Sequence, residues 1–99
     1  MQPIQRFKNS ITEGNLWFYV LSLGKEGEIQ EKETVALIFE KFGFLPNSLM
    51  IKTVLFRLKN EGYISREKLK GEKAYKTTEK GLKELEGMKN ICQNLLIKI

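Results

Sequence analysis

The side chains whose chemistry stands out are cations, and most of them are gathered in one segment. Residues 48–80 hold nine Lys and Arg residues against four Glu residues, which leaves a net charge of +5. The rest of the chain is almost neutral, with −1 over residues 1–47 and +1 over residues 81–99. Ammonium and guanidinium groups pair with phosphate oxygens, so a localised positive charge indicates a polyanionic partner.

The residue types that are missing exclude most other chemistry. The chain has no His and no Asp, and Cys92 is its only cysteine. Nucleophilic systems of the Ser-His-Asp or Cys-His kind are therefore excluded, as are Cys/His zinc sites and EF-hands. The sequence also lacks a Walker A loop and a GxGxxG motif. We therefore expect no enzyme, no catalytic residue, no metal site and no cofactor.

The cations of residues 48–80 fall on a helix and a hairpin. Apolar residues at helical spacing predict a helix that Asn47 or Ser48 caps and Gly62 ends. Residues 63–69 and 74–77 read as two strands joined by the polar connection Lys70-Gly71-Glu72-Lys73. Alternate strand residues share a face, so Arg66, Lys68 and Lys70 are expected to point the same way. A solvated edge hairpin, guarded by lysines against sheet pairing, is the alternative reading.

Three further helices are predicted before this segment. Residues 3–11 form a leading helix or arm, residues 12–24 an apolar helix, and residues 35–42 an amphipathic helix that ends at Gly43. Ile29 can pair briefly as an edge strand. The aromatic residues 17–19, with Phe39 and Phe42, favour a plain core over an effector pocket, and the sequence leaves any small-molecule effector unknown. The fold class is α+β and mostly helical.

Two stretches are similar to motifs of a known family. The family is that of winged helix-turn-helix transcriptional regulators. LFRLKNEGYI (residues 55–64) resembles the "LxxLExxGLI" pattern of these proteins, and AYKTTEKG (residues 74–81) resembles the "xYxLTxKG" pattern that closes their wing. The resemblance covers roughly residues 15–99. It is closest to the PadR type, because a long helix follows at once, and MarR-like proteins come second. It implies a winged helix-turn-helix with a C-terminal dimerisation helix.

The resemblance further implies double-stranded DNA as the partner, with one helix in the major groove and the hairpin as a wing on the backbone. On the helix, Arg57 can pair with guanine and Asn60 with adenine, while Lys52 suits a phosphate. The implied DNA-binding residues are Ser48, Lys52, Thr53, Arg57, Asn60, Arg66, Lys68, Lys70, Lys73 and Lys76. The outer side of this helix is unusually apolar, however, at Leu49, Met50 and Phe56. A protein-interaction module without direct DNA readout is therefore the alternative function.

The last helix predicts a homodimer. Apolar residues at alternating spacings of three and four form a seam that one small domain cannot cover, although its first turns can fold back onto the chain's own core. The predicted dimer contacts are Leu85, Met88, Cys92, Leu95, Leu96 and Ile99. Cys92 is read as a small buried hydrophobe, with an intersubunit disulfide as the alternative. The expected function is a homodimeric repressor of transcription.

Length and hydropathy limit the organisation of the chain. Its 99 residues suggest a single domain, 1–99, with a winged-helix core at 12–77 and the C-terminal helix at 78–99. No apolar run is long enough to span a membrane, and the first residues lack the apolar region of a signal peptide. We therefore expect a cytoplasmic protein with no membrane partner.

Overall fold

In the computed structural model, which describes residues 1–99, five α-helices pack with a small three-stranded sheet. Short 3-10 helices at Glu13–Asn15 and Glu31–Glu33 precede the second and third α-helices. The expected class, α+β and mostly helical, is confirmed. The α-helices are α1 (Pro3–Ile11), α2 (Leu16–Gly24), α3 (Thr34–Phe42), α4 (Ser48–Asn60) and α5 (Glu79–Lys98), and the strands are β1 (Ile29–Gln30), β2 (Ile64–Leu69) and β3 (Glu72–Thr77).

Helix α2 lies at the centre of the core and contacts α3, α4, α5 and β3. Its sequence is apolar on all sides, as expected of a helix that is surrounded by other elements. Each neighbour adds at least one buried side chain to the same hydrophobic cluster, so the five elements share one core. The largest fully buried side chains are Leu16, Val20, Leu21, Ile38, Ile51 and Leu58.

The aromatic residues of α2 and α3 behave mostly as core residues. Tyr19 packs edge-to-face against Phe18, Phe42 and Phe44, with ring centroids 4.8–5.5 Å apart. Phe39, predicted to lie on the buried stripe of its helix, is instead 55% exposed. The stripe of α3 is narrower than predicted because only Thr34 and Ile38 are buried on it.

The sheet is antiparallel with the order β1-β3-β2, and the predicted edge pairing of Ile29 is present. The hairpin differs from the prediction, because the strands are joined by two residues and not by four. Lys70 and Gly71 have φ angles of 53° and 78°, the left-handed pair that suits a two-residue hairpin turn. Glu72 and Lys73 therefore belong to β3, and Lys73 lies directly opposite Lys68.

The root of the hairpin is locked to the start of α5. Thr78 caps α5 by accepting a hydrogen bond from the Gly81 amide at 3.2 Å, and its hydroxyl donates to the Gly62 carbonyl at 2.7 Å. A Cβ at Gly81 would collide with the carbonyl oxygen of Tyr63, so only glycine fits there. These contacts join the end of α4 to the start of α5, and they hold the wing in a fixed place beside α4.

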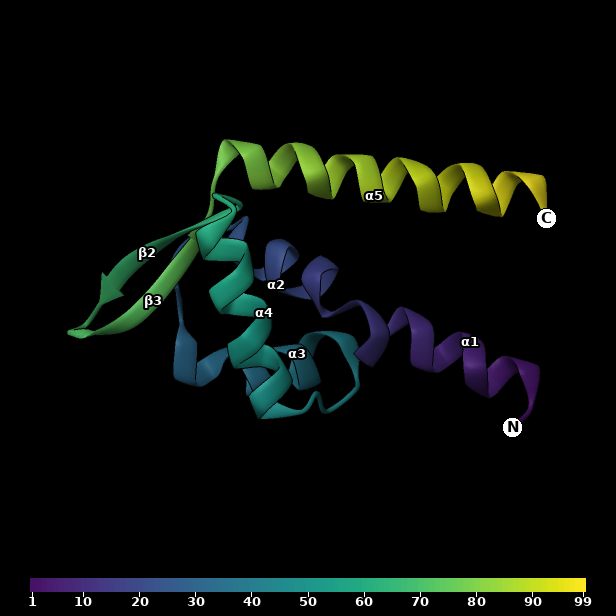
Figure 1. The fold of residues 1–99 in the computed structure, drawn as a ribbon, viewed down its shortest axis with the longest axis horizontal. Helices are drawn as coiled ribbons and strands as arrows, with labels where there is room; N and C mark the ends of the chain where they lie inside the picture. Colours follow the sequence, from purple (N-terminus) through teal and green to yellow (C-terminus); the bar gives the residue numbers. More distant parts are fainter.

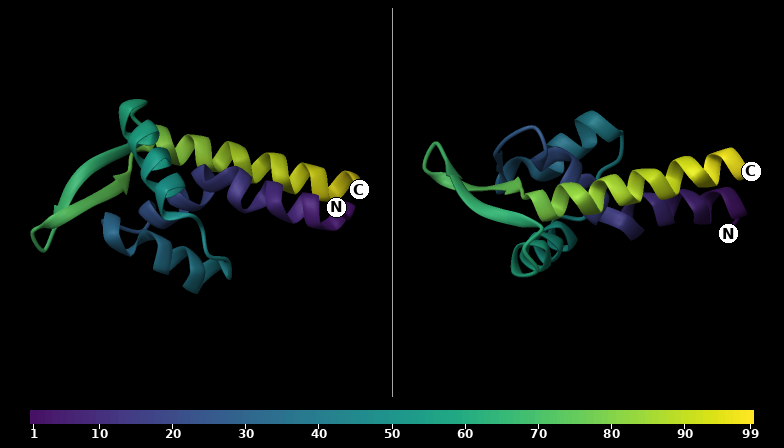
Figure 2. Two further views of the ribbon diagram at one scale, coloured as in Figure 1. Left: turned by 60° about the horizontal axis from the view of Figure 1, so that its bottom comes forward. Right: turned by 90° about the horizontal axis from the view of Figure 1, so that it is seen from above.

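Two helices project from the end of the molecule that is opposite to the hairpin, and both chain termini lie there (Figures 1 and 2). Helix α1 buries no residue, and α5 buries none beyond Leu85. The radius of gyration, 14.0 Å, is larger than the roughly 13 Å of a compact chain of this length, as projecting arms require. None of the helices is both long and apolar enough to cross a lipid bilayer.

Candidate nucleic-acid interface

Helix α4 holds its polar side chains outward because its opposite, apolar side is buried in the core. The Asn47 side chain caps its first turn, accepting hydrogen bonds from the amides of Leu49 and Met50 at 2.9 and 3.1 Å. Its buried stripe, Ile51, Val54, Leu55 and Leu58, faces the core. The predicted contacts of this helix are therefore all exposed: Ser48, Lys52, Thr53, Arg57 and Asn60.

The hairpin β2–β3 gathers three cations on one face. Arg66 lies opposite Tyr75, and Lys68 lies opposite Lys73, and residues in direct register share a face of the sheet. Lys70 does not continue this row as predicted, because it occupies the turn. Lys76 lies opposite Ser65 and so belongs to the other face. All five predicted wing cations are exposed.

Lys68 and Lys73 lie opposite one another as like charges, and neither takes part in an ion pair within the chain. Like charges directly opposite one another destabilise a hairpin. The ion pairs of the structure join Lys32 to Glu72 and Lys89 to Glu86, so neither Lys68, Lys73 nor Arg66 has an acidic partner. An anion placed over this face would relieve the repulsion.

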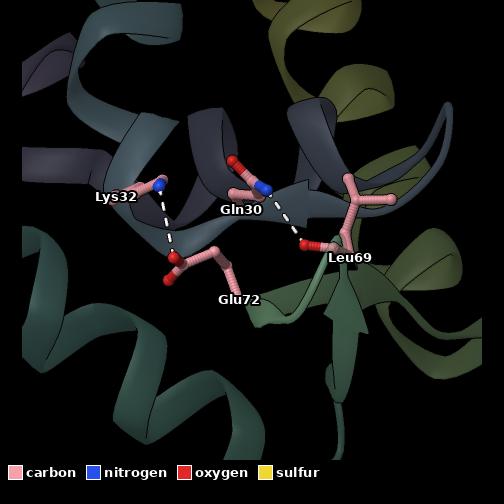
Figure 3. Close-up of polar contacts among 4 residues, drawn as sticks. All are labelled: Gln30, Lys32, Leu69 and Glu72. Atoms are coloured by element: carbon pink, nitrogen blue, oxygen red, sulfur yellow. Dashed lines mark hydrogen bonds and ion pairs between the residues drawn. The ribbon is translucent and has the colours of Figure 1, made fainter.

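The tip of the wing is tied to the end of β1 and to the 3-10 helix that follows it, as Figure 3 shows. The Gln30 side-chain amide donates to the Leu69 carbonyl at 2.9 Å, and the Lys32 ammonium lies 3.4 Å from the Glu72 carboxylate. The ion pair is more than half exposed and adds little stability, so the hydrogen bond is the stronger tie. The same pairing removes the negative charge of Glu72 from the field of the wing.

Helix α4 and the wing together line a cleft of about 250 Å³. Lys52 and Lys59 come to it from α4, and Arg66 and Lys73 come from the wing. Lys59 was not among the predicted contacts, although its spacing of seven residues from Lys52 places both on one side of the helix. Four cations and one carboxylate, Glu31, line this hollow, so its net charge is positive and suits a phosphate group. The chain brings the four cations together from two elements.

The floor of this cleft includes Tyr75, whose hydroxyl is buried without a hydrogen-bond partner. Burial raises the pKa of Tyr75 to about 12 and outweighs the opposing effect of the nearby Thr34 hydroxyl. The Thr34 hydroxyl donates its own hydrogen bond to the Gln30 carbonyl at 3.3 Å, so it is not a donor to Tyr75. Tyr75 is therefore a neutral part of the floor and supports the cations above it.

Not every cation of residues 48–80 is free to meet a partner. The Lys80 ammonium donates to the Glu61 carbonyl at 2.6 Å and lies 4.6 Å from the centre of the Tyr63 ring. Lys80 therefore closes the C-terminal end of α4 and has a structural role. The cations that remain unpaired are those of the cleft, the wing and Arg57.

The residues predicted to contact a second chain divide into two groups. Leu85 is only 4% exposed, because it lies in the chain's own core, so its assignment as a dimer contact is corrected. Met88 is half-buried beside it. The remaining predicted contacts are exposed on the projecting half of α5: Cys92, which is a free thiol, Leu95, Leu96 and Ile99.

Comparison with known proteins gives fold relatives only. No protein-family model and no curated protein matches the chain. The crystal structure of a PadR-family transcriptional regulator from Eggerthella lenta superposes with a TM-score of 0.81 at 21% identity, covering 96% of this chain and 87% of that one.

Two further structures are slightly more similar in sequence. Bacillus subtilis PadR in complex with operator DNA has a TM-score of 0.66 at 25% identity, covering 74% of this chain and 45% of that one. A PadR-like transcriptional regulator from Bacillus cereus has a TM-score of 0.62 at 28% identity, covering 73% and 44%. This chain thus spans less than half the length of either Bacillus protein. These likenesses confirm the expected resemblance: the chain has a winged-helix fold like that of PadR-type regulators.

Proposed function

We propose that this chain is a homodimeric regulator of transcription that binds double-stranded DNA. Helix α4 would enter the major groove, and the wing β2–β3 would follow the flanking phosphate backbone. The observation that carries the proposal is the set of unpaired cations that converges from α4 and the wing, with Lys68 held opposite Lys73. The operator complex of Bacillus subtilis PadR supports it by analogy of fold.

Exposed apolar side chains support the homodimer. Ile91, Leu95 and Leu96 are between 53 and 70% exposed on α5, and Ile4 and Phe7 are 75 and 59% exposed on α1. These side chains lie on the two helices that project from the core (Figure 1), and exposed apolar side chains gathered at one end of a molecule mark an interface. A second copy of the chain would cover it.

A two-fold dimer predicts an operator with inverted half-sites. Their centres should lie about 34–36 Å apart, or a multiple of that distance. Repression by blocking polymerase or another factor is the simplest mechanism for this chain, and the cytoplasm is where we propose that it acts. The comparisons do not favour the alternative of an interaction module without DNA readout.

Charge reversal on the wing tests the proposal. The double variant Lys68→Glu with Lys73→Glu should lose binding to duplex DNA in an electrophoretic mobility shift, because it places carboxylates where phosphates would lie. The matched control, Lys25→Glu with Lys83→Glu, makes the same charge change at exposed lysines outside residues 48–80 and should keep most of the binding. Equal loss in both variants would show that only net charge matters and would contradict the proposed interface.

A further inference from the structure

One row of α4 points directly away from the core, and it is largely apolar. Leu49, Thr53, Phe56 and Asn60 follow one another at spacings of four, three and four residues, opposite the buried stripe. Leu49 is 71% exposed and Phe56 is 63% exposed. Large apolar side chains at the most outward positions of a helix require a partner with apolar groups of its own.

Thr53 adds to the apolar character of this row. Its hydroxyl donates to the Leu49 carbonyl at 3.1 Å, so its only donor is used within the helix. The row therefore offers donors to a partner only at Asn60. A reading of base edges by hydrogen bonds alone does not account for the other three positions.

Cations border the row on both sides. Lys52 and Lys59 lie on the side that faces the wing, where they line the cleft, and Arg57 lies on the other side of the row. In the major groove of a duplex, Lys52 and Lys59 can meet the phosphates of one strand, while Arg57 can reach the acceptor atoms of a guanine. This complementarity of charge selects duplex DNA as the occupant, since an apolar protein surface would leave the flanking cations without partners.

Within the major groove, the base edges present polar atoms except at thymine, whose C5-methyl group is apolar. We propose that Leu49 and Phe56 contact thymine methyl groups, so that α4 selects A·T base pairs. Asn60, which suits adenine, completes the same preference. The inference rests on the proposed function and adds the class of sequence that this chain selects.

The spacing of the two side chains sets the spacing of the thymines. Seven residues of helix span about 10.5 Å along the axis. This distance equals about three base-pair steps of about 3.4 Å. Because α4 would follow the inclined groove and not the duplex axis, the contacted thymines should lie at most about three base pairs apart in each half-site.

Replacing thymine by uracil tests the inference, because uracil lacks only the methyl group. A duplex selected from a random library for tight binding to the full chain would be remade with deoxyuridine in place of thymidine. The unaltered chain should bind the uracil duplex more weakly, by about fourfold for each methyl group that is contacted. Leu49→Ala and Phe56→Ala should each bind the thymine duplex more weakly and lose part of this difference.

Lys70→Ala is the matched control, since the loss of a backbone contact should lower binding to both duplexes by the same factor. Equal affinity of the unaltered chain for the two duplexes, with binding still weakened by salt, would overturn the inference and leave the proposed function standing. If the chain binds no duplex at any salt concentration, both fall. The comparison of duplexes needs no variant, so a folding defect cannot mask the result.

Discussion

Single residues of α4 and the wing differ in what they can contact. Arg57 carries a planar guanidinium on an exposed helix, which suits two hydrogen bonds to guanine. The lysines of the wing carry point charges on flexible stems, and Lys68 and Lys73 are held opposite each other by the strand register. We therefore expect base selection from α4 and sequence-independent affinity from the wing.

Arg57→Ala should cost about 1–3 kcal/mol on the preferred site and much less on random DNA, because the contact with a base edge is lost. Fluorescence anisotropy with both duplexes measures the two affinities side by side. Lysine at the same position is the informative control, because it keeps the charge and loses the planar fork. Equal losses on specific and random DNA would assign Arg57 to the backbone instead.

Tyr75 makes stability depend on pH above the physiological range. Its folded pKa, raised to about 12 by burial, lies above the unfolded value of 10.0, so the folded chain holds the proton more tightly. The stability from this group is complete below pH 10 and is lost as pH rises from 10 toward 12.

Tyr75→Phe should remove that part of the pH dependence. It should also raise the free energy of unfolding near pH 7 by about 1 kcal/mol, because a buried hydroxyl without a partner is deleted. Chemical denaturation of both proteins at pH 7 and at pH 11 gives the comparison. If the free energy of unfolding changes between pH 7 and pH 11 by the same amount in both proteins, groups other than Tyr75 cause that change.

At the scale of elements, the helices were predictable and the arrangement of the wing was not. The spacing of Ile51, Val54, Leu55 and Leu58 predicts α4, because a helix with a buried face must repeat its apolar residues at that period. The pairing of Lys68 with Lys73 depends on the number of residues in the turn. Lys70 adopts a left-handed conformation that few non-glycine residues occupy, so a longer loop was predicted.

The residues that line the cleft could also be predicted only in part from the sequence. Lys52 and Arg57 could be predicted as contacts from their exposure on a helix, but Lys59 gains its place only when the wing packs beside α4. Leu85 fits the α5 seam by its spacing, yet spacing cannot tell whether an apolar face meets its own core or a second chain. Tertiary packing decides both.

Gly81→Ala tests the junction that holds the wing against α4. The new Cβ would meet the Tyr63 carbonyl oxygen, so the free energy of unfolding should fall by about 3 kcal/mol or more. Gly87→Ala is the control on the same helix, since its Cβ would meet nothing within 4 Å, and it should add up to about 1 kcal/mol. Thermal denaturation measures both; a harmless Gly81→Ala would refute the tight junction.

Leu95→Glu tests the proposed dimer contact of α5. Leu95 is 53% exposed in the single chain, so a charge there is harmless to the fold and costly only if a second chain covers it. Sedimentation should show a shift from dimer to monomer, with loss of tight operator binding because each half-site is then bound alone. Asn90→Glu, on the opposite side of α5 from the seam, should remain dimeric. An unaltered chain that sediments as a monomer at tens of micromolar would refute the contact.

In the whole molecule, the proposed DNA-binding surface and the proposed dimer surface lie at opposite ends. The wing lies at one end, and the projecting helices α1 and α5 lie at the other end of a particle measuring 45 × 27 × 22 Å (Figure 1). A dimer formed through the projecting helices would leave both wings uncovered. The net charge of +5 in residues 48–80 would then act twice on one duplex.

The salt dependence of binding to duplex DNA tests the central claim most directly. If about four to six cations of a dimer contact phosphates, the logarithm of the association constant should fall against the logarithm of salt concentration with a slope of about −4 to −5. The slope would come from titrations of duplex DNA with the protein at salt concentrations of roughly 50 to 300 mM, because such binding weakens over about this range. A slope near zero, or no binding at the lowest salt, would contradict the assignment of α4 and the wing to the phosphate backbone.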